Sequence, residues 1–160
     1  MLSLSLNPGS FTLKDGTITI TESIFSLVIK EEIENFRRIS LDEEVDIFVH
    51  DQLGVRFWAN EGQPVEIQVL FKVEDKERKP VFPNAAFKGD FTFMDSKFIL
   101  PVYFKDLLDK YEFVQDEDSL QYGILMYKHI ADEVVYTFTL DKSSGEVTTI
   151  SIASFMPSLS

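Results

Sequence analysis

Two ten-residue stretches with nearly the same pattern decide the fold that we expect for this chain. The first is residues 11–20 (FTLKDGTITI), and the second, 80 positions later, is residues 91–100 (FTFMDSKFIL). Both begin Phe-Thr and have Asp at the fifth place. Each predicts a β-hairpin, with Asp15-Gly16 or Asp95-Ser96 as its turn. In a chain of 160 residues, a spacing of 80 indicates two copies of one unit.

A helix is expected after each hairpin. Apolar residues recur three and four positions apart over residues 24–36 and again over residues 102–113, which is the spacing of one helical face. Thr21 suits the N-cap of the first helix through its hydroxyl, and Pro101 suits the first turn of the second, where a missing N–H costs nothing. The repeat therefore continues beyond the hairpins.

Antiparallel strands are expected after each helix. They are predicted at residues 45–49, 55–58 and 65–71 in the first copy, and at residues 122–127, 134–138 and 147–152 in the second. Val65, Ile67 and Val69 alternate with polar residues, which suits a sheet with one face packed and one face wetter. His50 and His129 fall at matching turns between the predicted strands.

The expected fold class is therefore α+β. Two tandem repeats, residues 10–72 and 87–154, are joined by a charged and proline-bearing connector at 73–86. Each repeat is a hairpin, one α-helix and about three antiparallel strands, and the helices pack on the antiparallel sheet. A unit of this size alone would bury only about 60% of its surface, so we expect a single globular domain over residues 1–160 in which the halves share a sheet or pack together.

Composition favours a protein of the cytoplasm. The chain has no Cys, which excludes disulfides and thiolate metal sites and fits a reducing compartment. Residues 1–8 have no basic region and no apolar core of signal-peptide length, and alternation at Leu2, Leu4 and Leu6 indicates an edge strand. No stretch approaches the roughly 20 apolar residues of a membrane span.

The chain is strongly acidic. Its formal net charge is −12, and each half contributes −6, from 9 basic and 15 acidic residues in the first and 6 and 12 in the second. Such a field repels nucleic acid and anionic membranes and attracts basic partners, although it also serves solubility alone. We therefore expect neither a nucleic acid nor a membrane as partner.

Motifs for catalysis are missing. There is no Cys nucleophile, no Gly-x-Ser-x-Gly elbow, no phosphate-binding loop and no dinucleotide fingerprint, so no cofactor is expected. His50, Asp51 and Asp46 with Glu43 or Glu44 have no metal-motif spacing. Adjacent carboxylates are plentiful, but runs of them are typical of solvated faces. Core positions are the default for the aromatic residues; Trp58 ends a strand beside an acidic loop, where an exposed ring would suit an interface.

Two segments resemble a known family. Residues 48–57 (FVHDQLGVRF) resemble its Asp-x-Leu-Gly hairpin, and residues 83–91 (PNAAFKGDF) resemble the start of its second copy. The family is a duplicated bacterial domain of uncharacterised function found in toxin–immunity gene neighbourhoods, and the resemblance covers roughly residues 10–154. Its motifs are turns and strand starts, which specify a fold and not a site. The second copy has Ala131-Asp132-Glu133 instead of the Asp-x-Leu-Gly turn.

The resemblance implies an immunity protein, not an enzyme. Such a protein would bind a cognate antibacterial effector, delivered by a contact-dependent or type VI-like secretion system, and would occlude its active site. Acidic side chains would match a basic cleft of the toxin. The candidate partner-binding residues are those of the acidic breaks and hairpin tips: Glu43, Glu44, Asp46, Asp51, Trp58, Glu61, Asp116, Glu117 and Asp118.

Two other functions stay open. Secretion chaperones are also small, acidic α+β proteins, and a tight homodimer would favour that role over immunity. An enzyme that uses the turn at His50 or His129 is the third possibility, and retention of function after His50→Ala and His129→Ala together would eliminate it. Neither the toxin nor the repeat that carries the interface follows from the sequence.

Overall fold

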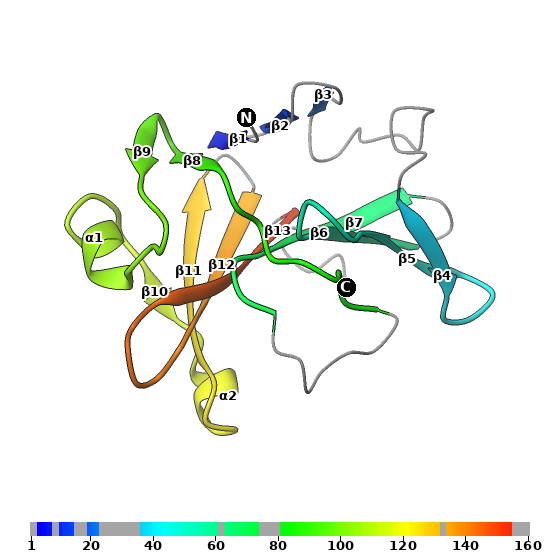
Figure 1. The fold of residues 1–160 in the computed structure, drawn as a ribbon. Coiled ribbons are helices and arrows are strands. Elements are labelled where there is room, and N and C mark those ends of the chain that lie inside the picture. The colour runs from blue at the N-terminus through cyan, green and yellow to red at the C-terminus, as the bar shows by residue number, and fades with distance from the viewer. Residues whose placement is uncertain are drawn as a thin grey trace.

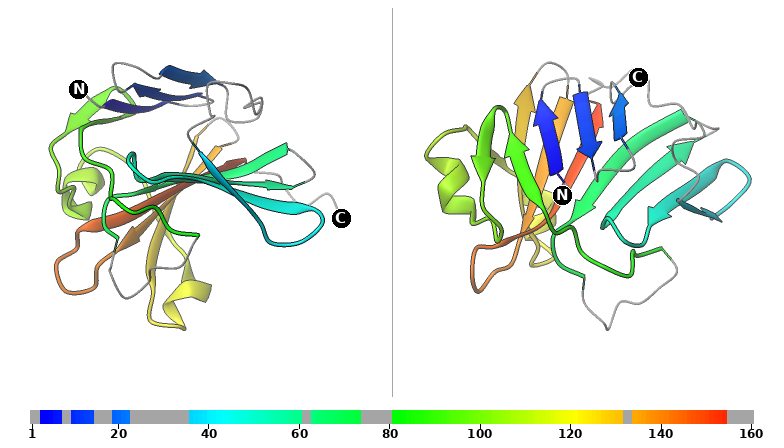
Figure 2. Two further views of the ribbon diagram at one scale, coloured as in Figure 1. Left: turned by 45° about the vertical axis from the view of Figure 1, so that its right-hand side comes forward. Right: turned by 45° about the horizontal axis from the view of Figure 1, so that its top comes forward.

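Two β-sheets, one of five strands and one of eight, form most of the structure (Figure 1). The structure is a computed structural model, and it describes residues 3–7, 10–14, 19–22, 36–60, 63–73, 81–131 and 134–154. The small sheet lies over one face of the large sheet, as the two turned views also show (Figure 2). Two short helices, α1 (Phe104–Leu108) and α2 (Glu117–Leu120), lie at the periphery.

The small sheet has the order β3-β2-β1-β8-β9. Its strands are β1 (Ser3–Asn7), β2 (Ser10–Lys14), β3 (Thr19–Glu22), β8 (Asp90–Phe93) and β9 (Ser96–Phe98). All neighbours pair antiparallel except β1 and β8, which pair parallel. The two hairpins predicted from the sequence thus lie on either side of β1.

The large sheet is antiparallel throughout and has the order β10-β11-β12-β13-β7-β6-β5-β4. Its strands are β4 (Arg37–Ser40), β5 (Val45–His50), β6 (Val55–Asn60), β7 (Gln63–Leu70), β10 (Val114–Gln115), β11 (Leu125–Ala131), β12 (Val134–Leu140) and β13 (Val147–Ser154). β7 pairs with β13, so both halves of the chain contribute to one sheet. The duplication itself stays a prediction.

The core lies between the two sheets. Strands of both alternate buried and half-buried residues, so each turns one apolar face inward. Phe93 of the small sheet meets Tyr136 and Phe138 of the large sheet edge-on, with ring centroids 5.1 and 5.3 Å apart. The Tyr136 hydroxyl donates a 2.8 Å hydrogen bond to the Asn7 carbonyl oxygen of β1. Aromatic packing and this hydrogen bond therefore hold sheet on sheet.

The predicted α+β class is wrong, because sheet packs on sheet and no described helix covers a sheet. α1 has five residues and α2 has four. Most of the first expected helix falls outside the described residues, but Thr21, its expected cap, lies in strand β3 opposite Thr12. No helix in the described residues is long and apolar enough to cross a membrane.

The second expected helix is short because its beginning pairs with a distant part of the chain. The Val102 carbonyl oxygen accepts from the Val147 N–H, and the Phe104 N–H donates to the Gly145 carbonyl oxygen. Residues 102–104 are therefore partly extended beside the β12–β13 turn, and Pro101, expected in the first turn, precedes the helix. These long-range backbone hydrogen bonds override the helical spacing of the apolar residues.

Strand β1 is central and not the edge strand that the sequence suggested. β1 is hydrogen-bonded on both sides, to β2 and to β8, and its Leu4 and Leu6 side chains are fully buried in the core. The second hairpin is confirmed as β8–β9, but its turn is Met94-Asp95, one residue earlier than predicted, with φ of 49° and 69°. Such a two-residue turn with two positive φ angles matches the twist of the strands. The turn of the first hairpin lies outside the described residues.

The strands expected after the helices exist, with one shift. β5, β6, β7, β12 and β13 match their predictions within a few residues. β11 begins at Leu125 and continues to Ala131, so His129 lies in a strand and not in a turn. The shift arises because α2 and the turn after it occupy residues 117–123, where the sequence suggested an irregular acidic segment followed by a strand.

Candidate functional site

Hydrogen bonds within the loop hold the turn between β5 and β6. The buried His50 side chain accepts, through Nδ1, from the backbone N–H groups of Gln52 and Leu53, both at 3.3 Å. Gly54 closes the turn with φ of 70°, a conformation that glycine adopts without a steric penalty. His50 thus organises a turn, which is a structural task.

This turn is bonded to residues 81–87. The Asp51 carboxylate accepts from the Asn84 N–H at 3.2 Å, and the Asp51 carbonyl oxygen accepts from the Ala85 N–H at 2.9 Å. The two segments on which the family resemblance depends are therefore in direct contact. We call these hydrogen bonds, which join the β5–β6 turn to the chain entering the second hairpin, the clamp. The clamp explains the residue pattern of the two segments.

Asp51 is further engaged by a two-pronged ion pair. Arg37 of β4 donates from Nε to Oδ2 at 2.7 Å and from Nη2 to Oδ1 at 2.8 Å. The Arg37 hydrogen bond is the main cause that lowers the pKa of Asp51, helped by the Arg37 charge and the Asn84 N–H and opposed by partial burial. Asp51 was a candidate for partner binding, but its oxygens are occupied inside the fold.

The Asp51→Asn variant is expected to be less stable at neutral pH by about 1–2 kcal/mol, because the ion pair with Arg37 is lost. The loss is limited because both side chains keep some contact with solvent. A lowered folded-state pKa stabilises the fold above the unfolded value, about 3.9, and this stabilisation is lost as pH falls through the folded pKa. Urea denaturation between about pH 5 and pH 2 should therefore give a shallower loss of stability in the variant. Identical slopes in both proteins would contradict this role.

Asp46 has a similar structural task at the edge of the sheet. It accepts from Arg38 Nη2 and from the Ser40 hydroxyl, both at 2.8 Å, across the β4–β5 pair. The Ser40 hydrogen bond is the main cause that lowers the pKa of Asp46, and Arg38 contributes as well. This carboxylate therefore ties the edge strand to its neighbour.

The tip of the β4–β5 turn does present free carboxylates. Asp42 is used locally, since its Oδ1 accepts from the Glu44 and Val45 N–H groups at 2.8 Å. Glu43 and Glu44 are exposed, and no ion pair holds either of them among the described residues. The neighbouring Leu41 is also exposed. Glu43 and Glu44 are thus the available part of the first acidic break.

The second acidic break forms the start of α2. Asp116 is the N-cap, where its carboxylate accepts from the Asp118 N–H at 3.2 Å and from the Ser119 hydroxyl at 3.0 Å, and Lys128 Nζ lies 3.8 Å away. The Ser119 hydrogen bond is the main cause that lowers the pKa of Asp116. Glu117 and Asp118 are exposed, and neither is in an ion pair in the part of the chain that the structure describes.

The two acidic breaks do not form one site. The β4–β5 turn and α2 lie toward opposite edges of the eight-stranded sheet, apart in Figure 1 and in both views of Figure 2. With neighbouring strands about 4.8 Å apart, the separation is on the order of 30 Å. Glu61, the remaining acidic candidate, lies outside the described residues. A partner of ordinary size would therefore use one break at a time or only one of them.

Trp58 is half-buried on the outer face of the large sheet. The Arg56 guanidinium carbon lies 5.8 Å from the centre of its ring. Its indole Nε1 is buried and has no hydrogen-bond partner among the described residues. Only part of the ring reaches solvent, so Trp58 is a weaker interface anchor than its position in the sequence suggested.

The histidines give no support to a catalytic role. His129 Nδ1 lies 2.8 Å from the Glu112 carbonyl oxygen, to which it would donate, and its ring packs among Phe93, Tyr111 and Phe113. His50 holds its own turn. Within the described residues, no three His, Asp or Glu side chains are placed to hold a metal ion. Both histidines therefore make contacts typical of structural residues.

Apolar side chains that the sequence did not suggest join the second acidic break in a surface around α2. Leu120, Tyr122 and Ile124 are exposed beside the carboxylates of Glu117 and Asp118, and Tyr122 is 82% exposed. We call these five residues the α2 surface. Large apolar side chains at the surface beside free charges are typical of protein-binding sites. Sequence reasoning missed them because residues 122–124 were assigned to a half-buried strand.

A concave site adjoins the α2 surface at Ile124. It has a volume of about 320 Å³ and lies on the outer face of the large sheet, where β7 and β13 meet. We call it the threonine hollow. Its lining residues are Leu70, Lys72, Val73, Phe82, Ile124, Thr139, Thr148 and Thr149. Five separate parts of the chain build this hollow, so no local sequence motif predicts it.

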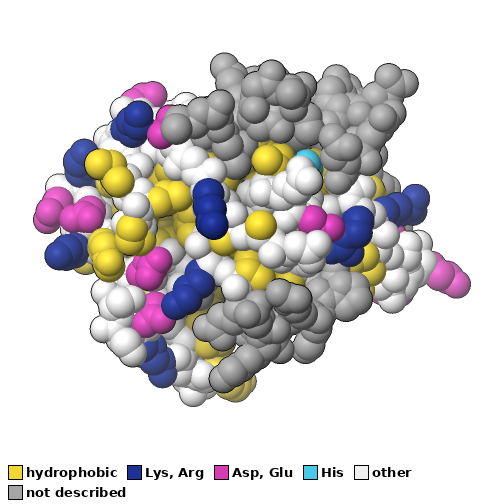
Figure 3. All heavy atoms as spheres, viewed as in Figure 1, with side chains coloured by type: hydrophobic (Ala, Val, Ile, Leu, Met, Phe, Trp, Pro, Cys, Tyr) yellow, Lys and Arg dark blue, Asp and Glu magenta, His cyan; other side chains and the backbone are white. Residues whose placement is uncertain are grey.

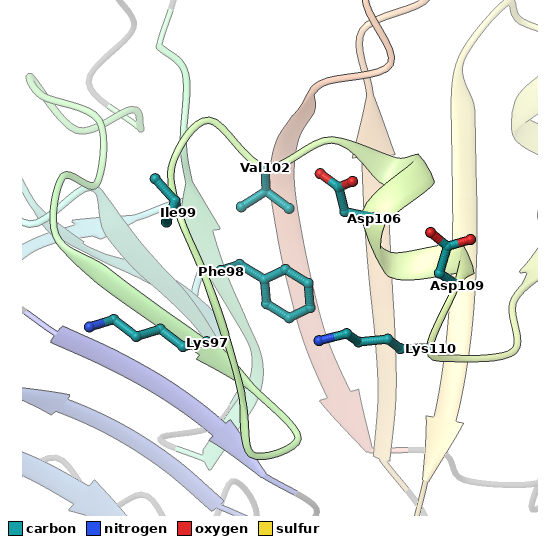
Figure 4. Close-up of a pocket in the computed structure, with 7 residues that line it drawn as sticks. All are labelled: Lys97, Phe98, Ile99, Val102, Asp106, Asp109 and Lys110. Atoms are coloured by element: carbon teal, nitrogen blue, oxygen red, sulfur yellow. The ribbon is translucent and has the colours of Figure 1, made fainter.

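A second concave site lies between β9 and α1 (Figure 4). Its volume is about 390 Å³, and Phe98 and Val102 form an apolar floor. Basic, acidic and hydrophobic side chains are interspersed on this side of the molecule, at the left of Figure 3. The charged residues around the pocket are Lys97, Lys110, Asp106 and Asp109. Because both signs are present in equal number, the pocket does not select an acidic or a basic ligand.

The comparison with known families identifies a family and gives no function. A family described as a domain of unknown function, DUF7738, matches residues 3–107. No curated protein and no solved structure matches the chain significantly. The match covers the small sheet, the clamp and the first half of the large sheet, and it stops before the α2 surface. Because the match spans well over half of its length, the chain belongs to the DUF7738 family.

Proposed function

We propose that this chain is an immunity protein, which binds a cognate antibacterial toxin in the cytoplasm and occludes its active site. The observation that carries the proposal is the α2 surface, where exposed apolar side chains adjoin two free carboxylates. The net charge of −12 favours a basic partner, and the resemblance to domains of toxin–immunity neighbourhoods favours a toxin. The proposal assigns no catalysis and no cofactor to the chain.

The α2 surface is preferred over the β4–β5 tip as the contact site. Both present two exposed carboxylates, but among the described residues the tip has Leu41 alone as an exposed large apolar neighbour, whereas the α2 surface has three such residues and a hollow beside them. Interface free energy comes mainly from a few desolvated anchors, and charged rims mainly steer and select. The second half of the chain therefore supplies the main contact.

Capture from lysate of the source cells tests the function. The immobilised chain should retain one small protein, which is then purified, and its toxicity should be blocked by an equimolar amount of the chain. A captured protein without toxic activity, or toxicity that the chain does not block, would refute the proposal. A tight homodimer that retains several secreted proteins would instead favour the chaperone.

Charge reversal at the two ends of the sheet tests the site. The double variant Glu117→Lys, Asp118→Lys is expected to weaken binding of the captured toxin about 100-fold, because like charges placed together in an interface cost several kcal/mol. The matched control is Glu43→Lys, Glu44→Lys, which changes the net charge equally at the opposite end. Isothermal titration should show less than about a threefold change for the control. Equal losses in both variants would mean that net charge alone matters.

A further inference from the structure

The threonine hollow has the form of a receptor for one aromatic side chain. We propose that the partner seats a Tyr or Trp there, between Phe82 and Ile124, with Lys or Arg residues beside it for Glu117 and Asp118. This inference rests on the proposed function for the identity of the partner, but the hollow itself can be tested alone. Tyr and Trp carry a large apolar body and a polar tip, and they dominate interface hot spots.

The Phe82 wall of the hollow is held in place from behind. The Arg56 guanidinium carbon lies 4.5 Å from the centre of the Phe82 ring, within the range of a cation–π contact. Arg56 is itself fixed, since Nε donates to Gln68 Oε1 at 2.6 Å and Nη1 donates to the Val81 carbonyl oxygen at 2.8 Å. A preformed wall lowers the ordering cost of binding.

The floor of the hollow has mixed polarity. Leu70 is buried beneath it, and the Thr148 hydroxyl is satisfied by the Thr139 carbonyl oxygen at 3.1 Å. The hydroxyls of Thr139 and Thr149 have no side-chain hydrogen bond within the described residues. Their methyl groups suit a ring, and their hydroxyls can bond an indole N–H or a phenol O–H. A purely aliphatic anchor would desolvate these hydroxyls without replacing their hydrogen bonds.

The volume of the hollow and the charges around it further restrict which side chain can occupy it. A volume of about 320 Å³ lies at the lower end for ligand pockets and suits one ring system. The lining residues include Lys72, whose Nζ lies 3.8 Å from the Asp141 carboxylate, and no Asp or Glu, so a cationic anchor inside would find no acidic partner among them. The free carboxylates lie outside, on α2. The partner is therefore expected to place its cation next to the anchor and not in the hollow.

The test uses the purified full chain with three small probes: N-acetyl-tryptophanamide, N-acetyl-tyrosinamide and N-acetyl-leucinamide. Nuclear magnetic resonance titration should give millimolar binding of the two aromatic probes, with shifts centred on Ile124, Thr139 and Thr149. Thr149→Trp fills the hollow and should weaken this binding at least tenfold. The matched control is Thr92→Trp, a half-buried strand threonine of the small sheet, which should leave binding unchanged.

The possible results distinguish failure of this inference from failure of the proposed function. Equal binding of the leucine probe, or aromatic binding that persists in Thr149→Trp, would overturn the inference. A second variant, Ile124→Glu, tests the hollow in case Thr149→Trp does not fold. The Ile124 side chain is exposed, so it can be changed with little effect on stability. If the captured toxin binds both threonine variants equally, the aromatic anchor is refuted while the immunity function stands. If the probes bind as expected but no toxin is captured, the hollow stands and the function fails.

Discussion

The Gly54→Ala variant is expected to lose about 3–5 kcal/mol of unfolding free energy, a large fraction of the roughly 5–15 kcal/mol that stabilises an ordinary domain. Two effects combine at this position. Its φ is 70°, which costs an alanine about 1 kcal/mol or more. An added Cβ would also lie 2.2 Å from the Phe87 backbone nitrogen and 2.6 Å from the Ala86 carbonyl carbon. Backbone atoms of the clamp cannot swing away as a side chain can.

Gly145→Ala is the matched control for this prediction. Gly145 has nearly the same φ, 75°, but an added Cβ would meet nothing within 4 Å. The control should therefore lose only the conformational term, about 1 kcal/mol. Urea denaturation of both variants measures the difference. Equal losses would show that the β5–β6 turn can move away from residues 85–87, and the clamp would then be less rigid than we infer.

Phe93→Ala is expected to cost about 3–5 kcal/mol, the usual range for a fully buried phenylalanine. Phe93 has no exposed surface, and its ring meets those of Tyr111, Tyr136 and Phe138 at 5.1–5.3 Å. The ring belongs to the small sheet, whereas Tyr136 and Phe138 belong to the large sheet. The variant should therefore weaken the attachment of one sheet to the other as well as leave a cavity.

Tyr122→Ala provides the contrast for Phe93→Ala. Both remove an aromatic ring, but Tyr122 is largely exposed, so its loss should change stability by less than about 0.5 kcal/mol. Denaturation midpoints compare the two, and the near-ultraviolet circular dichroism of Phe93→Ala should show the loss of fixed aromatic packing. A small effect at Phe93 would mean that the sheets are held mainly by other contacts, such as the Tyr136 hydrogen bond to Asn7.

Local patterns predicted the strands well. Alternation at Val65, Ile67 and Val69 indicated β7, and the hairpin pattern of residues 91–100 indicated β8 and β9, because period-two burial follows directly from strand geometry. The same patterns said little about helices. Residues 102–113 have apolar residues at helical spacing, yet only Phe104–Leu108 is helical, because the residues before it bond to the β12–β13 turn some 40 positions away.

The acidic candidates illustrate a different limit. Asp51, Asp46 and Asp116 look like the other carboxylates in the sequence, but in the fold they bond to Arg37, Arg38 and Ser119, which orders turns and edges. Glu43, Glu44, Glu117 and Asp118 are exposed, and none of them forms an ion pair with another described residue. A charge count cannot separate these two groups, because the cations and N–H groups that engage a carboxylate are chosen by strand pairing and turn geometry.

The sequence by itself determined the acidity of this protein, the absence of thiol chemistry, the two hairpins and most of the strands, since these depend on residue type and on neighbours close in the chain. Only the tertiary structure decided that β1 is central, that both halves share one sheet, and that residues from β7, β12, β13, Phe82 and Ile124 enclose a hollow. The physical reason is that backbone hydrogen bonds between strands are formed by every residue alike. Which strands pair is therefore decided by how the whole apolar surface is buried, and not by any one stretch.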